Sequence, residues 1–87
     1  MKVQYSMSVA PGHAIELGEA TWANGERSIR DRWATANGGF SNTQSSEVPM
    51  ASLVPMLMFA AQHDELAAAE CAEIISALAA SIKRQHP

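Results

Sequence analysis

Residues 53–61, LVPMLMFAA, form an unbroken apolar run that restricts how the chain can fold. Ser52 can cap a helix at this point, and Pro55 would then lie in the first helical turn, where proline is well tolerated. We therefore predict a turn near 49–52 and a helix over about 53–63. Because this helix has no polar face, it must be buried on most sides or contact a partner. The run is much shorter than the ~20 residues that a membrane-spanning helix needs.

A second helix is predicted over about 66–84, where apolar residues recur at helical spacing. Its apolar stripe consists of Cys71, Ile74, Ile75, Leu78 and Ile82. Acidic residues lie near the start of this segment and Lys83 and Arg84 at its end, an order that complements the helix dipole. The two helices should form an antiparallel hairpin with one another.

The N-terminal half is typical of strands. Over residues 2–9, Val3, Tyr5, Met7 and Val9 alternate with polar residues, which predicts a half-buried strand. Pro11 and Gly12 follow as a turn signal.

Two further strands, 15–23 and 26–34, are predicted around Asn24-Gly25, the favoured centre of a two-residue hairpin turn. In that register, Trp22, Ala20, Ile29 and Trp33 share an apolar face, and Glu19 lies opposite Arg30. Two residues do not fit this pattern: Asp31 falls on the apolar face and Leu17 on the polar one. A helix over 26–34 is the alternative, because Ile29 and Trp33 are also four residues apart.

Residues 35–47 are rich in Gly, Asn, Ser and Thr and are predicted to form a loop in which Phe40 anchors to the core. The predicted fold is thus a single α+β domain over 1–87. It combines a small antiparallel sheet of about three strands (2–9, 15–23 and 26–34) with a C-terminal helical hairpin (about 53–63 and 66–84) packed on the apolar face of the sheet.

Composition excludes several classes of function. The net charge of −3 does not fit a strongly basic nucleic-acid-binding domain. The single cysteine, Cys71, cannot form an internal disulfide, which together with the lack of a signal-peptide pattern favours a cytoplasmic location. The spacing of the histidines and Cys71 matches no metal-binding motif, so we expect no metal site and no cofactor. Because Cys71 lies on an apolar stripe, we expect a buried, inert thiol and no catalytic residues.

Two groups of residues are candidates for partner binding. Arg27, Arg30 and Arg32 lie close to both tryptophans, and arginine binds carboxylates and phosphates through paired hydrogen bonds. Met56, Met58 and Phe59 lie on the apolar helix, and methionine is common at adaptable binding surfaces.

We therefore expect a small, non-enzymatic cytosolic binding or regulatory protein that contacts a protein partner or a second copy of itself. An accessory protein, an adaptor or an inhibitor, including one encoded by a phage or another mobile element, fits this profile. Two alternatives stay open. One is a nucleic-acid-binding module that uses the Arg-rich hairpin, and the other is a small enzyme that depends on Cys71.

Overall fold

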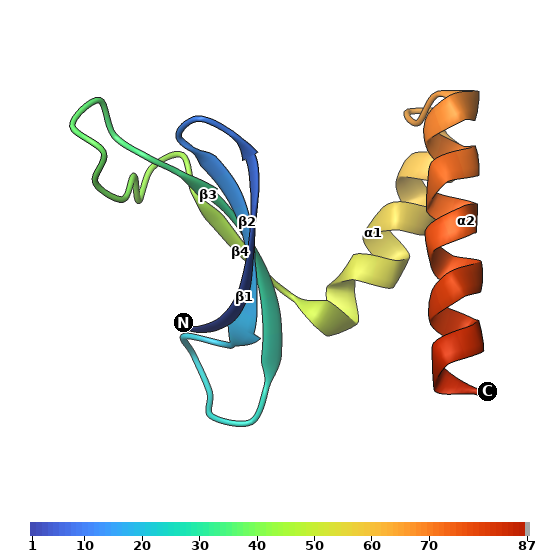
Figure 1. The fold of residues 1–87 in the computed structure, drawn as a ribbon, viewed down its shortest axis with the longest axis horizontal. Coiled ribbons are helices and arrows are strands. Elements are labelled where there is room, and N and C mark those ends of the chain that lie inside the picture. Colours follow the sequence, from blue (N-terminus) through green and yellow to red (C-terminus); the bar gives the residue numbers. More distant parts are fainter. Residues whose placement is uncertain (87) are drawn as a thin grey trace. The chain divides into compact units, whose positions relative to one another are not determined.

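The computed structural model describes residues 1–86 and divides the chain into two compact units. The strand unit, Met1–Val54, contains four strands, and the helical unit, which begins at Pro55, contains most of α1 and all of α2. Figure 1 shows both units. The predicted α+β class is confirmed, although the sheet has four strands where about three were expected. The expectations of a single domain and of helices packed on the sheet stay predictions.

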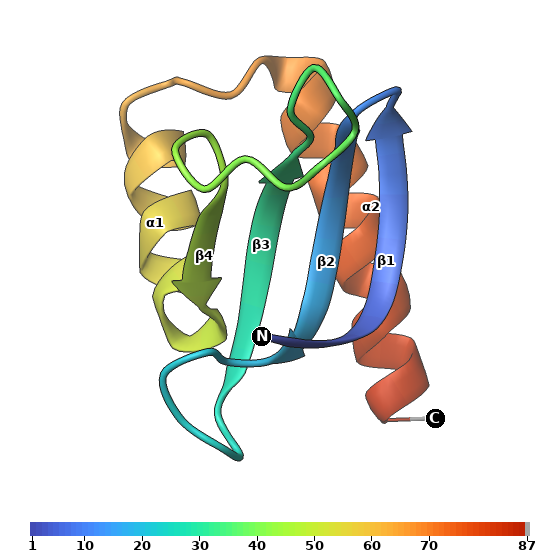
Figure 2. The same cartoon turned by 90° about the vertical axis from the view of Figure 1, so that its left-hand side faces the viewer.

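The sheet is an antiparallel meander in which each strand pairs with the next along the chain, as Figure 2 shows face-on. The strands are β1 (Lys2–Ala10), β2 (His13–Glu19), β3 (Arg27–Trp33) and β4 (Ser46–Pro49). The strand assignment of 26–34 is thus confirmed over the helical alternative. Strand β4 was missed, because its four residues combine loop-forming Ser46 with a proline that signals a turn.

The connection between β2 and β3 differs from the predicted two-residue turn. It spans residues 20–26, and only Gly25 adopts a positive φ (85°), whereas a type I′ turn requires positive φ at both central positions. The longer loop moves the register by three residues, so that Glu16 lies opposite Arg30 and Leu17 opposite Ile29. Glu19 instead accepts a hydrogen bond from the Gly25 N–H at 2.9 Å within the loop. The predicted Glu19–Arg30 pair is wrong.

The observed register separates the sheet into an apolar face and a polar face. On the apolar face, Tyr5 and Met7 of β1 lie opposite Leu17 and Ile15, and Leu17 lies opposite Ile29. Leu17, which the sequence-based register placed among polar residues, therefore belongs to this face. The polar face carries Glu16 and Ser28, both buried, together with Arg30 and Arg32. Within the strand unit, the buried side chains are thus the polar Glu16, Ser28 and Ser41 and the small apolar Ala20.

Irregular pairing interrupts the alternation predicted for β1. The register shifts between Val3 and Tyr5 and again between Ser8 and Ala10. As a result Val3 lies opposite Gly18 on the polar face, while Tyr5 and Met7 lie on the apolar face. The prediction that Val3, Tyr5 and Met7 share one side is therefore wrong, because each inserted residue reverses the alternation of side chains.

Helix α1 (Met50–Gln62) and helix α2 (Ala68–Gln85) form the C-terminal third of the chain. Helix α1 begins three residues before the predicted start, so Ser52 lies inside the helix and does not cap it. Asp64 adopts a positive φ in the connection between the helices. At the start of α2, the Glu70 carboxylate accepts a hydrogen bond from the Ala67 N–H at 2.9 Å, which satisfies one free donor of the first turn.

Across residues 1–86, neither helix combines the length and the hydropathy that crossing a lipid bilayer would need.

Candidate functional site

A layered charge cluster lies on the polar face of the sheet. The Glu16 carboxylate accepts a hydrogen bond from Arg30 Nε at 2.8 Å and forms an ion pair with Arg30 Nη2 at 2.7 Å. Arg32 Nε lies 3.9 Å from the same oxygen. The Phe40 ring covers both guanidinium groups, whose central carbons lie 4.7 and 5.5 Å from the ring centre. In Figure 2 the segment that carries Phe40 folds over one end of the sheet. The arginines are therefore held between a carboxylate and an aromatic ring.

This geometry divides the predicted arginine group. Arg27 lies opposite Glu19 on the other face of the sheet and donates a hydrogen bond to the Gln4 side chain. Arg30 and Arg32 do lie together, but both contact Glu16 and Phe40. Phe40 was expected to anchor in an apolar core, and instead it remains partly exposed above the two guanidinium groups. The signal that could have identified Glu16 is its position opposite Arg30 once the turn is lengthened to seven residues.

Glu47 of β4 is the centre of a second polar cluster, which sequence analysis missed. Its carboxylate accepts hydrogen bonds from the Thr21 N–H (2.9 Å), the Thr21 hydroxyl (2.7 Å) and the Ser28 hydroxyl (2.9 Å). Burial by itself would raise the pKa of Glu47, but the hydrogen bonds from Thr21 and Ser28 outweigh it and hold the pKa below its ordinary value of 4.5. The cluster fastens β4 to the start of the β2–β3 loop.

We expect Glu47→Gln to destabilise the strand unit by about 1–2 kcal/mol at neutral pH, because the amide accepts these hydrogen bonds more weakly than the carboxylate. A carboxyl group with a lowered folded pKa stabilises the fold above its unfolded pKa and loses that effect as the pH falls through the folded value. The difference between wild type and variant should therefore shrink below pH 4.5. Urea denaturation followed by tryptophan fluorescence measures the free energy of unfolding of both proteins. A difference between them that does not change with pH would contradict this role for Glu47.

His13, Asp31 and Trp33 form a third cluster at one end of the apolar face. The His13 ring stacks on the Trp33 indole with centroids 3.7 Å apart and hydrogen-bonds to Asp31. Trp33 Nε1 donates to the other Asp31 oxygen at 3.0 Å. The hydrogen bond from His13, and after it that from Trp33, lowers the pKa of Asp31. In the predicted register Asp31 did not fit the apolar face. In the structure it lies on that face and bonds to His13 and Trp33, which lie on the same face.

The tryptophans do not form the core that sequence analysis assigned to them. Trp22 lies in the β2–β3 loop, where its Nε1 donates to Glu26 at 2.6 Å, and Trp33 lies at the end of β3. Both remain at least 37% exposed in the structure. Their polar ring nitrogens each reach a carboxylate, which keeps both indoles at the margin of the sheet.

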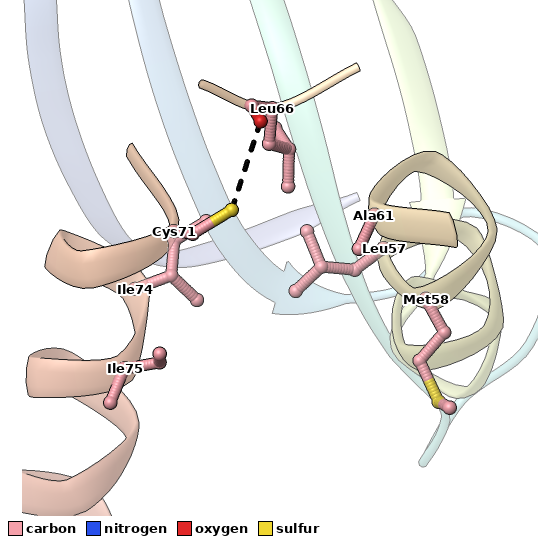
Figure 3. A pocket seen from close by; sticks show the side chains of 7 residues that line it. All are labelled: Leu57, Met58, Ala61, Leu66, Cys71, Ile74 and Ile75. Carbon is pink, nitrogen blue, oxygen red and sulfur yellow. Dashed lines mark hydrogen bonds between the residues drawn. The ribbon is translucent and has the colours of Figure 1, made fainter. Parts of the chain in front are cut away.

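The helical unit holds an apolar groove between α1 and α2, shown in Figure 3. Its volume is about 310 Å³, and its lining consists of Leu57, Met58, Ala61, Leu66, Cys71, Ile74 and Ile75. The Cys71 thiol is half-buried and lies 3.8 Å from the Leu66 carbonyl oxygen, to which it donates. Cys71 is therefore surrounded by apolar side chains and a backbone carbonyl in this groove.

The three candidate residues of α1 are all exposed. Met58 lines the rim of the groove, while Met56 and Phe59 lie outside it. Phe59 is 65% exposed and contacts the His63 ring edge-on at 4.7 Å between centroids. The structure thus places Met56, Met58 and Phe59 at the surface of the helical unit, on different sides of α1.

No group of three or more His, Cys, Asp or Glu side chains within residues 1–86 is arranged to hold a metal ion. Among protein families, curated proteins and solved structures, the chain finds no match.

Proposed function

We propose that the protein is a small, non-enzymatic binding protein of the cytosol that acts through contacts with protein chains, as an accessory protein, adaptor or inhibitor. The observation that carries this proposal is the apolar surface of the two helices. Neither α1 nor α2 contains a buried residue in the part of the chain that the structure describes. Large apolar side chains on both helices are more than half exposed, namely Val54, Met56, Met58, Phe59, Ile75, Leu78 and Ile82.

Surface of this kind is unfavourable in water and marks interaction sites in soluble proteins. Helix α1 is apolar on every side and contains no charged residue. Even a helix packed against a neighbouring helix and a sheet retains one uncovered side. A partner chain that covers such a side would bury residues such as Phe59, at a gain of roughly 1.5–3 kcal/mol for each large side chain.

The test compares Phe59→Glu with Gln62→Glu, which adds a carboxylate at a polar position of the same helix. Light scattering of the full chain measures its self-association. In a separate experiment the full chain is immobilised and used to capture proteins from a host lysate. We expect wild type and Gln62→Glu to associate or to retain a partner, and Phe59→Glu to do so at least tenfold more weakly. Both tryptophans lie in the strand unit, so their fluorescence confirms that this unit remains folded. A wild-type chain that is monomeric and retains no protein would refute the proposal.

The nucleic-acid alternative has less support. Arg27 lies on the opposite face from Arg30 and Arg32, and those two already contact Glu16. A phosphate would have to displace this carboxylate. We expect no retardation of DNA or RNA in a gel at about 50 mM salt, where phosphate contacts are stronger than at higher salt concentrations. Retardation that weakens steeply with salt would favour this alternative instead.

A further inference from the structure

The tripeptide Ala-Asn-Gly occurs twice in the strand unit, at residues 23–25 and 36–38. Both glycines adopt a positive φ, which is 85° at Gly25 and 83° at Gly38. A methyl group placed on either glycine would meet no atom within 4 Å. The two copies lie in loops at opposite ends of the sheet (Figure 2). They therefore share their local sequence and their open surroundings within the strand unit.

The two copies differ in the group that accepts the glycine N–H. The Gly25 N–H donates to the Glu19 carboxylate at 2.9 Å, whereas the Gly38 N–H donates to the Thr35 backbone carbonyl at 2.9 Å. A carboxylate can take up the proton of its donor as a general base, and a backbone carbonyl cannot. Only the first copy thus has a base in contact with the glycine nitrogen.

This nitrogen is the atom that an asparagine side chain can react with most directly. The side-chain carbonyl carbon of an asparagine can close a succinimide ring onto the backbone nitrogen of the next residue. Because glycine has no Cβ, residue 25 offers little steric resistance to the approach of the Asn24 side chain. The nitrogen becomes a nucleophile only when it loses its proton, which is the step that a hydrogen-bonded base assists.

We propose that Glu19 is the general base of a self-modification in which Asn24, in preference to Asn37, becomes aspartate or isoaspartate. The Glu19 carboxylate takes the proton of the Gly25 N–H, and the nitrogen attacks the Asn24 side-chain carbonyl carbon. The amino group of the tetrahedral intermediate then receives this proton from Glu19 and leaves as ammonia. Water opens the resulting succinimide ring. The reaction consumes one water, releases one ammonia and returns Glu19 to its carboxylate form.

The product changes the loop in which it forms. It adds a negative charge between Glu19 and Glu26, and a carboxylate at position 24 would repel Glu19 and weaken its bond to the loop. The isoaspartate product also inserts a methylene group into the backbone after residue 24. The same loop carries Thr21, which bonds to Glu47. The modification should therefore loosen the attachment of the loop to β4.

The first test compares the two asparagines within one wild-type sample. The folded chain is incubated in water labelled with heavy oxygen and then digested with trypsin, which cleaves after Arg27 and so places Asn24 and Asn37 on different peptides. Mass spectrometry measures the labelled fraction of each peptide. We expect Asn24 to react at least about threefold faster than Asn37, because only its nucleophile is in contact with a base.

The same measurement in concentrated urea is the control for local sequence. Both asparagines are preceded by alanine and followed by glycine, so their rates should become nearly equal once the chain is unfolded. Equal rates in the folded chain would overturn the proposal. A preference for Asn24 that persists in urea would also overturn it, because the preference would then not depend on the contact with Glu19.

The second test removes the base and leaves a hydrogen-bond acceptor in its place. Glu19→Gln should slow the reaction of Asn24 at least about threefold and leave that of Asn37 unchanged. Glu26→Gln is the matched control, because it removes the same charge from the same loop, but from a carboxylate that bonds to the Trp22 indole. This variant should not slow the reaction of Asn24. Circular dichroism verifies that both variants remain folded.

The sign of the effect separates a base from a group that only holds the loop. If Glu19 merely restrained the loop, Glu19→Gln would free the Asn24 side chain and would also remove a negative charge that opposes ionisation of the neighbouring N–H. Both changes would accelerate the reaction. A rate at Asn24 that rises or stays the same in Glu19→Gln would therefore refute the role of Glu19 as the base.

Discussion

Gly18→Ala is expected to destabilise the strand unit by about 3 kcal/mol or more. A methyl group on Gly18 would lie 1.9 Å from the Lys2 carbonyl oxygen and 2.8 Å from its carbonyl carbon. These atoms belong to the backbone of β1, so no side-chain rotation can relieve the overlap. Strand β1 would have to move away from β2 at the point where its register shifts.

Gly25→Ala is the matched control, because it adds the same methyl group where no other atom lies within 4 Å. Its positive φ of 85° still makes alanine unfavourable, at a cost of about 1 kcal/mol. Urea denaturation of both variants provides the comparison, and hydrogen exchange of the β1 amides locates the damage. If Gly18→Ala costs no more than Gly25→Ala, the close approach of β1 to Gly18 is wrong.

Glu16→Gln is expected to cost about 2 kcal/mol, the second large effect. Glu16 is only 9% exposed and is the carboxylate that faces both Arg30 and Arg32. Removal of its charge leaves the Arg30 guanidinium, whose side chain is only 17% exposed, beneath Phe40 without its ion-pair partner, and an unpaired, poorly hydrated charge is costly. The loss should therefore exceed that of one ordinary surface ion pair, which is usually below ~1 kcal/mol.

Glu19→Gln serves as the control, because the two-residue turn would have made Glu19 the partner of Arg30. In the observed register Glu19 bonds to the Gly25 N–H, so this variant should lose less than about 1 kcal/mol. A double-mutant cycle with Arg30→Met should give a coupling energy of at least about 1 kcal/mol for Glu16 and close to zero for Glu19. If Arg30 is coupled to Glu19 instead, the register with the two-residue turn is the correct one.

Much of the fold follows from local sequence patterns. The alternation in residues 2–9 and the apolar stripe from Cys71 to Ile82 predicted β1 and α2 to within two residues at each end. Long periodic segments are predictable because each residue repeats the same local preference. Strand β4 was missed because Ser46–Pro49 has no such repetition and is held by pairing with β3 and by the hydrogen bonds to Glu47.

The candidate site was predicted less well than the fold. Met56, Met58 and Phe59 were expected at an interaction surface, and they are exposed on α1. The structure places Arg27 on a different face of the sheet from Arg30 and Arg32, because neighbouring positions of a strand alternate between the two faces. Arg27 and Arg30 are an odd number of residues apart and therefore lie on opposite faces. Phe40 and Glu47 reach their partners across the loop and the sheet, which no local pattern encodes.

Residue spacing and local conformational preferences account for the antiparallel strands, the two helices and the apolar character of α1, so these features are readable in the sequence. Which residues face one another depends on how the strands pair. The observed loop has seven residues where two were predicted, so the register of β3 against β2 differs from the predicted one by three positions. In the observed register Glu16 pairs with Arg30 and Leu17 lies beside Ile29. The physical reason is that side chains alternate with a period of two, so an odd shift in register exchanges the faces on which two strands meet.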